Sequence, residues 1–135
     1  MSEVVLDASV VLKWFRAAGE RHREEALALR RAFEAGELVV FAPSLLWLEV
    51  VNIAARRWGW SARELDGLAV QLPALGFVTI EPDLAGVARW AGLGLSAYDA
   101  AYVAVAEETG AQLVTDDAGI LDVAADLATP LASGT

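Results

Sequence analysis

Short apolar runs alternate along this chain with longer segments that have the spacing of amphipathic helices. The runs are rich in valine, leucine and phenylalanine and end at polar or turn residues, which is typical of buried strands. They predict strands at 4–6, 38–41, 77–80 and 113–115, and a fifth near 129–132. The intervening segments predict helices at 9–14, 20–35, 43–58, 61–75 and 83–91 and one that begins at Ser96.

Strands separated by helices favour right-handed crossovers, and therefore a mainly parallel central sheet with helices on both faces. The fold class that we expect is α/β. The chain has 135 residues and shows no internal repeat and no linker, so we expect one domain that spans residues 1–135.

Two details of the first and second helices enter this prediction. Ser9 is a plausible N-terminal cap for the first, because its hydroxyl can accept a hydrogen bond from a free backbone N–H group. Gly36 is expected to end the helix at 20–35, since glycine is common directly after a helix end.

The composition excludes several kinds of chemistry. The chain has no cysteine, so disulfides, thiolate metal sites and a thiol nucleophile are excluded. Its one histidine, His22, lies in the charged segment 20–25, where we expect it to be solvated. A histidine-pair mechanism, a Ser-His-Asp triad and histidine zinc sites are therefore excluded as well. Glycine-rich phosphate-binding motifs are also missing.

Charge and hydropathy add expectations about location and partners. The formal net charge of −9 argues against non-specific DNA binding, because phosphate contacts need basic residues. It does not exclude a nuclease, since carboxylates that hold a metal ion also count as negative. The first residues lack the features of a signal peptide, and no apolar window is long enough to span a membrane, so we expect a cytoplasmic protein. The hydrophobic fraction of 56% suggests an apolar surface that a partner covers.

Carboxylates remain as the candidate functional groups, and their oxygens suit Mg²⁺ or Mn²⁺. Ligands of an open parallel sheet bind at the carboxyl ends of its strands. Asp7 directly follows the first predicted strand, and Asp116 and Asp117 follow the fourth. Asp99 lies in the first turn of the helix that begins at Ser96, and Glu49 lies two turns into an apolar helix. These positions predict an acidic site at one edge of the sheet.

Each acid also has a purely structural interpretation. Asp7 and Asp117 could cap the helices or turns that follow them, and Asp99 stands three residues after Ser96, the spacing of a capping box. Glu49 differs, because a carboxylate among leucine and valine needs a partner or a cation to offset the cost of burial. For Glu49 a functional role is favoured.

Other polar residues lie on the same helix as Glu49. Asn52 and Arg56, three and seven residues further on, share its face. Asn52 could orient a carboxylate or a water on the metal, and Arg56 could meet a phosphate, although a solvated charge explains Arg56 more simply. The five tryptophans are expected in the core or at an interface, and none is assigned to base stacking.

Four motifs in this order resemble the PIN-domain family, in particular the short VapC-type toxins of toxin–antitoxin modules. The first is Val5-Leu6-Asp7-Ala8-Ser9, and the second is Glu49-Val50-Val51-Asn52. The third runs from Leu95 to Tyr102 and contains Asp99, and the fourth is Leu113-Val114-Thr115-Asp116-Asp117. Together the motifs cover residues 4–121.

The resemblance implies a PIN-like three-layer sandwich, a Mg²⁺ or Mn²⁺ site and cleavage of RNA. It also implies a homodimer inhibited by a small antitoxin protein whose tail fills the cleft. The catalytic and metal-binding acids of the family fall on Asp7, Glu49, Asp99 and Asp117. Asp117 takes the last position of the family's Thr-x-Asp motif, and Asp116 the variable one. Ser9, Asn52, Thr115 and Asp116 are expected to support the site.

The mechanism that we expect is metal-assisted hydrolysis of a phosphodiester bond. Asp7 and Asp99 are the expected direct ligands, and Glu49 and Asp117 complete the cluster directly or through water. Two other classes stay open: a PIN-like binding module without activity, and a receiver-type phospho-signalling domain. A receiver, however, would carry its acid pair after the first strand and a lysine late in the chain, whereas Lys13 is the only lysine. DNA as the substrate also stays open.

Overall fold

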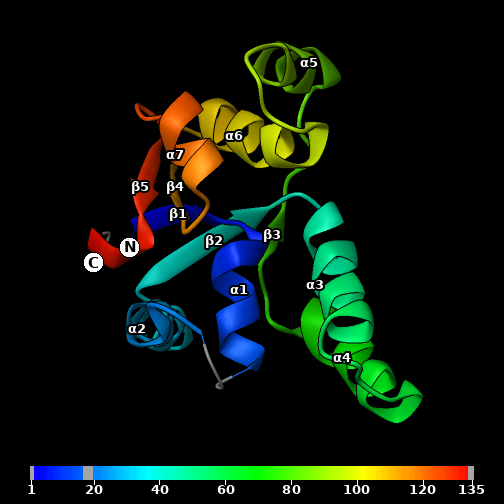
Figure 1. Cartoon of the computed structure of the whole chain (residues 1–135). Helices are drawn as coiled ribbons and strands as arrows, with labels where there is room; N and C mark the ends of the chain where they lie inside the picture. Colours follow the sequence, from blue (N-terminus) through cyan, green and yellow to red (C-terminus); the bar gives the residue numbers. More distant parts are fainter. Residues whose placement is uncertain (1, 17–19, 134–135) are drawn as a thin grey trace.

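Five strands form one parallel sheet in the computed structural model, which describes residues 2–16 and 20–133 (Figure 1). The order is β3-β2-β1-β4-β5, and each neighbouring pair is parallel. The strands are β1 (Ser2–Leu6), β2 (Leu38–Ala42), β3 (Val78–Thr79), β4 (Gln112–Thr115) and β5 (Ala128–Pro130). The predicted parallel α/β sheet is confirmed, with a fifth strand that begins slightly earlier than expected.

Four helices cover one face of the sheet, the lower face in Figure 1. They are α1 (Ala8–Phe15), α2 (Arg23–Glu34), α3 (Leu45–Arg56) and α4 (Ala62–Ala74). The opposite face carries α5 (Leu84–Gly92), α6 (Ala97–Thr109) and α7 (Ala118–Val123), and a 3₁₀ turn, η1 (Leu131–Ser133), follows β5. Because helices lie on both faces, the molecule has the three layers that the sequence predicts.

The helix α6 is the central element of its layer. Seven consecutive residues, 100–106, are buried, and alanine and valine account for six of them. A helix that is apolar on every side must be buried by neighbouring elements. Accordingly, α6 packs against β1, β2 and β4 as well as α5. It ends at Gly110, whose φ of +74° is strained for residues with a side chain.

The strand register determines which loop ends meet. Leu6 of β1 pairs with Val114 of β4, so the next residues along each strand, Asp7 and Thr115, emerge side by side. The chain order across the sheet also reverses between β1 and β4. Such a switch point is where open α/β sheets bind ligands, and the fold therefore places Asp7 and Thr115 at its usual binding edge.

Three expectations about local structure need correction. The first helix begins at Ala8, so Ser9 lies inside it rather than at its N-cap, which is Asp7. The helix α7 was not predicted, because six residues are too few to show helical periodicity. His22 is not simply solvated: its side chain is 26% exposed and contacts Asp116. In the described ranges, no helix has the length and apolar character needed to cross a membrane.

Candidate active site

Asp7 lies at the centre of the candidate site. It follows β1 directly and is only 3% exposed, an unusual burial for a carboxylate. Asp7 occupies the N-cap position of α1, but its side chain accepts no capping hydrogen bond from that helix. The capping interpretation therefore does not explain why this carboxylate is buried.

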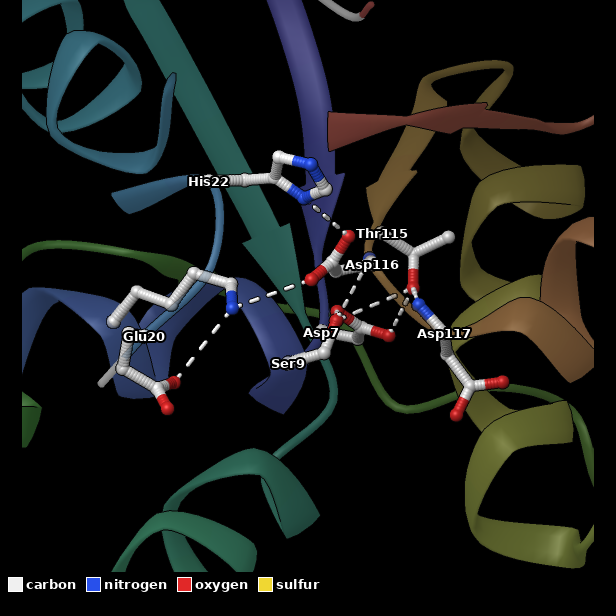
Figure 2. Close-up of polar contacts among 8 residues, drawn as sticks. Asp7, Ser9, Glu20, His22, Thr115, Asp116 and Asp117 are labelled. Carbon is white, nitrogen blue, oxygen red and sulfur yellow. Dashed lines mark hydrogen bonds and ion pairs between the residues drawn. The ribbon is translucent and has the colours of Figure 1, made fainter. Parts of the chain in front are cut away.

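Two hydroxyl groups hold the Asp7 carboxylate (Figure 2). Ser9 Oγ donates to Asp7 Oδ1 at 2.6 Å, and Thr115 Oγ1 donates to Asp7 Oδ2 at the same distance. The same hydroxyl oxygens accept from the loop after β4: Asp116 N lies 2.9 Å from Ser9 Oγ, and Asp117 N lies 3.0 Å from Thr115 Oγ1. The two hydroxyls thus connect each oxygen of Asp7 to one backbone N–H group of that loop.

Burial is the main cause that raises the pKa of Asp7 from 3.8 to about 7, and the nearby charges of Asp117 and Asp99 contribute to the rise. The hydrogen bonds from Ser9 and Thr115 lower the pKa but do not cancel the effect of burial. Because a carboxylate has about four lone-pair positions and these bonds occupy two, Asp7 can still accept a proton or a cation.

The adjacent acids Asp116 and Asp117 point in different directions (Figure 2). Asp116 forms an ion pair with Lys13, whose Nζ lies 3.2 Å from Oδ2, and its Oδ1 lies 3.1 Å from His22 Nδ1. Lys13 is itself 5% exposed and also contacts Glu20 at 3.6 Å. Lys13 and His22 thus engage both oxygens of Asp116, which does not line the pocket that Asp117 lines.

Asp117 has two structural roles. Its Oδ1 accepts from Ile120 N at 2.9 Å, which caps α7, while the residue also lines the same pocket as Asp7. Capping and a place in the pocket were alternatives at the level of sequence. In the folded protein they coexist, because a carboxylate has a second oxygen left after capping.

Glu49 projects from α3 toward Tyr102 of α6, whose hydroxyl donates a hydrogen bond to Glu49 Oε1. Burial raises the pKa of Glu49, as does the charge of Asp99, while the bond from Tyr102 lowers it. Burial and the Glu49 charge also raise the pKa of Tyr102, so its hydroxyl keeps its proton and stays a donor. The polar partner expected for Glu49 is thus a tyrosine.

Asp99 lies in the first turn of α6. Ser96 Oγ accepts from Asp99 N at 3.0 Å, so the serine caps the helix. In residues 2–16 and 20–133 the carboxylate of Asp99 makes no return bond to Ser96 N, unlike Glu64, which closes a full capping box with Ser61. Burial raises the pKa of Asp99, and the charge of Asp117 raises it further. The side chain is therefore free to serve the pocket.

The four predicted acids line one pocket of about 310 Å³. Its wall consists of polar and charged side chains with a few apolar ones: Asp7, Ala8, Ser9, Leu12, Lys13, Glu20, Glu49, Ile53, Arg57, Asp99, Tyr102 and Asp117. Among the described residues, however, no group of three or more His, Cys, Asp or Glu side chains is arranged to hold a metal ion directly. The acids share a pocket without forming a closed ligand cage.

The polar residues of α3 fall on two hollows, and Arg56 is exposed, as a solvated charge would be. Arg57, not Arg56, lines the pocket, because the face that starts at Glu49 continues through Ile53 to Arg57 at intervals of four residues. Asn52 lines a neighbouring apolar hollow of about 370 Å³ with Leu45, Leu48, Glu49 and Tyr98. Tyr102 and Lys13 were not predicted as site residues, since a tyrosine and a lysine within apolar segments resemble ordinary core and surface residues.

The raised pKa of Asp7 predicts how the stability of the metal-free protein depends on pH. The folded protein favours the protonated carboxyl of Asp7. The resulting stabilisation of the folded state is complete below the unfolded pKa of about 4 and is lost as the pH rises through 7. The free energy of unfolding in EDTA should fall by roughly 2–3 kcal/mol more between pH 5 and pH 8 in wild type than in Asp7→Asn. Urea unfolding curves at both pH values test this, and parallel pH dependences would contradict it.

The Asp99 carboxylate either destabilises the protein by repulsion from neighbouring acids or stabilises it as a charge at the helix start. The sign of the stability change in Asp99→Asn distinguishes the two. If repulsion by Asp117 dominates, Asp99→Asn should stabilise the protein in EDTA. If the helix dipole dominates, the same change should cost about 0.3–1 kcal/mol. Glu64→Gln is a matched control at the same helix position outside the pocket, and it should be destabilising. Thermal melts that show both variants less stable than wild type would leave Asp99 as a helix-terminal charge alone.

Comparison with known structures and sequences identifies relatives of this fold. PAE2754 from Pyrobaculum aerophilum is 26% identical over 98% of this chain and 92% of its own, with a TM-score of 0.65. VapC20 from Mycobacterium tuberculosis is 18% identical over 91% of this chain and 94% of its own, with a TM-score of 0.64. FitAcB from Neisseria gonorrhoeae is 16% identical over 96% of this chain and 99% of its own, with a TM-score of 0.62. At these identities the last two show a shared fold alone.

A sequence model of one family covers most of the chain. The model described as the PIN domain matches residues 4–126, from the first buried strand to the segment after α7. No curated protein matches the sequence. The matched range contains Asp7, Glu49, Asp99 and Asp117, and the parallel sheet with helices on both faces agrees with the solved relatives. The chain therefore belongs to the PIN-domain family.

Proposed function

We propose that this protein is a metal-dependent endoribonuclease of the VapC toxin type, which hydrolyses RNA phosphodiester bonds and is inhibited by a small antitoxin. The observation that carries the proposal is the convergence of Asp7, Glu49, Asp99 and Asp117 on one pocket at the switch point of a PIN-family sheet. Proteins of this family are generally nucleases. VapC20, which shares the fold, is described as a toxin that cleaves the sarcin–ricin loop.

The donors in the pocket suit Mg²⁺ or Mn²⁺. All four candidate ligands are carboxylates, which are hard oxygen donors. Among the described residues, no three such side chains are poised to contact one metal ion directly. This does not conflict with the assignment. Mg²⁺ usually keeps several waters and needs only one or two protein carboxylates. We assign the direct contacts to Asp7 and Asp99, with Glu49 and Asp117 acting directly or through water.

The residues of the pocket would contribute to hydrolysis in different ways. A divalent cation there would lower the pKa of a coordinated water and offset charge on the transition state. Ser9 and Thr115 orient the Asp7 carboxylate so that its free lone pairs stay available. Tyr102 fixes the rotamer of Glu49 at the opposite wall. Because Asp7 has a pKa of about 7, it must release its proton before it can bind a cation near neutral pH.

The receiver-type alternative is not compatible with the fold. Receiver domains have the strand order 2-1-3-4-5, whereas this sheet has the order 3-2-1-4-5. The only lysine is buried in α1, where it pairs with Asp116 and Glu20, and does not lie late in the chain. An inactive PIN-like binding module remains the alternative, and DNA remains a second possible substrate. Both are distinguished from the proposal by the cleavage assay below.

The antitoxin, the dimer and the cytoplasmic location are further parts of the proposal. An apolar hollow shares Glu49 with the acidic pocket, and its rim exposes Leu48 to 74% and Tyr98 to 64%. Exposed leucine and tyrosine next to a functional pocket suit the apolar face of a partner helix. These features support an antitoxin segment that covers the hollow and reaches the acids. The homodimer rests on the family resemblance.

Cleavage of structured RNA should require Mg²⁺ or Mn²⁺ and should stop in EDTA. Asp117→Asn should lower the rate by about two orders of magnitude or more, because it removes a carboxylate from the pocket. Asp116→Asn should keep most of the activity, since Asp116 faces Lys13 and His22 instead. A gel assay with labelled RNA, and with DNA of the same sequence, measures all of these effects.

Several outcomes would overturn parts of the proposal. Cleavage that persists in chelator would exclude a metal-dependent site. Failure to cut any RNA with either metal, by a protein that melts cooperatively, would favour the inactive binding module. Equal losses in Asp116→Asn and Asp117→Asn would mean that the assignment of the fourth acid to Asp117 is wrong. A preference for DNA would change the substrate class but leave the metal site intact.

A further inference from the structure

The acidic pocket is also lined by residues of α1 and by residues along and just after α3. Its α3 wall consists of Glu49, Ile53 and Arg57, which lie on one face at intervals of four residues. Eight residues of α-helix span about 12 Å at 1.5 Å per residue. The charge of Asp99 acts on both Glu49 and Asp7, which groups the acids near Glu49, whereas Arg57 follows the last turn of α3. The pocket therefore extends well beyond the acids themselves.

Arg57 is the cation of this pocket that remains available to a ligand. Lys13 also lines the pocket, but it pairs with both Glu20 and Asp116 and is 7% exposed along its side chain. Arg57 is exposed, and within residues 2–16 and 20–133 its guanidinium has neither an ion pair nor a hydrogen bond. An unpaired guanidinium at the end of an acidic pocket is suited to bind an anion that extends out of it.

A second cation lies beside Arg57. The guanidinium of Arg16, directly after α1, stacks on the ring of Trp58 at 5.4 Å from its centroid. Trp58 follows Arg57 in the chain, and its ring lies 5.3 Å from that of Trp60. Positive charge combined with aromatic rings is the combination by which proteins hold single-stranded nucleic acid. The segment directly after α3 therefore has both features, adjacent in sequence to Arg57, which lines the pocket.

Basic and acidic residues are unevenly distributed along the chain. Nine of the ten basic residues belong to the first 63 residues, which form α1, α2, α3 and the start of α4: Lys13, Arg16, Arg21, Arg23, Arg30, Arg31, Arg56, Arg57 and Arg63. Beyond residue 63 there are eleven acidic residues and one basic residue, Arg89, which pairs with Glu107. The first 63 residues also form β1 and β2 and carry eight acids, so their net charge is +1, whereas the residues beyond 63 carry −10. A polyanion is therefore repelled far less by the first half of the chain than by the second.

We propose that Arg57 binds a backbone phosphate of the RNA that flanks the scissile phosphodiester, and that the RNA strand leaves the acidic pocket between α1 and α3. This inference rests on the proposed ribonuclease function and adds the direction in which the substrate lies. It also accounts for RNA binding by a protein with a net charge of −9, because the favourable contact is confined to one side of the pocket.

The test compares Arg57→Ala and Arg57→Lys with Arg56→Ala, a change of the adjacent exposed arginine that does not line the pocket. Binding of a labelled single-stranded RNA is measured by fluorescence anisotropy with Ca²⁺ in place of Mg²⁺, across a range of salt concentrations. Arg57→Ala should weaken binding about tenfold and reduce the slope of log K against log salt by about 0.7, the loss expected for one phosphate contact. Arg57→Lys should keep the slope, and Arg56→Ala should behave as wild type.

Cleavage kinetics in Mg²⁺ give a second measurement. Arg57→Ala should raise KM while kcat changes little, since the contact lies outside the reacting phosphodiester. If wild type cuts RNA and Arg57→Ala matches Arg56→Ala in KM and in salt slope, the inference is wrong and the proposed function stands. A loss in kcat alone would also contradict a flanking phosphate contact. If wild type neither binds nor cuts RNA, the proposed function and this inference are overturned together.

Discussion

The hydrogen bonds from Ser9 and Thr115 to Asp7 connect the two strands between which the sheet reverses its order. Each hydroxyl also accepts from the backbone after β4, so the buried carboxylate fixes the path of the loop that carries Asp116 and Asp117. Without these donors, a carboxylate that is 3% exposed would have no polar partner to offset the cost of leaving water. The raised pKa of Asp7 reflects the part of that cost that the two bonds do not offset. Glu49 and Asp99 reach the same pocket from α3, which packs against α1, and from α6, which packs against β1, β2 and β4.

Much of this arrangement could be predicted from the sequence, and the reason is the parallel sheet. Asp7 and Asp117 follow short apolar runs that are typical of buried strands, and parallel strands end at one edge. The direction in which each side chain points was harder to predict from the sequence. Asp116 and Asp117 are adjacent, and their different orientations depend on Lys13 and His22, which lie about 100 residues away in sequence. Arg56 and Arg57 differ by one helix position, so a small error in the phase of α3 exchanged them. The helix α7 was missed because one and a half turns leave no periodic pattern.

The acidic composition has a different meaning once the charges are placed in the fold. A net charge of −9 argues against nucleic-acid binding only if the charges are evenly spread. Here nine of the ten basic residues lie in the first 63 residues, which are close to neutral, and the excess of acids lies in the rest of the chain. Lys13 pairs with Asp116, which does not line the pocket. Asp7, Asp99 and Asp117 share the pocket, and the charge of Asp117 raises the pKa values of the other two. The electrostatic cost of this crowding is what a divalent cation would relieve. Metal binding, stability and the orientation of a substrate are therefore linked through one set of carboxylates.

Direct measurement of Mn²⁺ binding tests the central claim, that the buried Asp7 carboxylate organises a metal site. Isothermal titration calorimetry at pH 8, where Asp7 is ionised, compares wild type with Asp7→Asn and with Asp116→Asn as the control. The account predicts that wild type and Asp116→Asn bind Mn²⁺ with similar affinity, because Asp116 is engaged by Lys13 and His22. Asp7→Asn should lose binding by at least about tenfold while it still unfolds cooperatively. Equal Mn²⁺ affinity in wild type and Asp7→Asn would contradict the account.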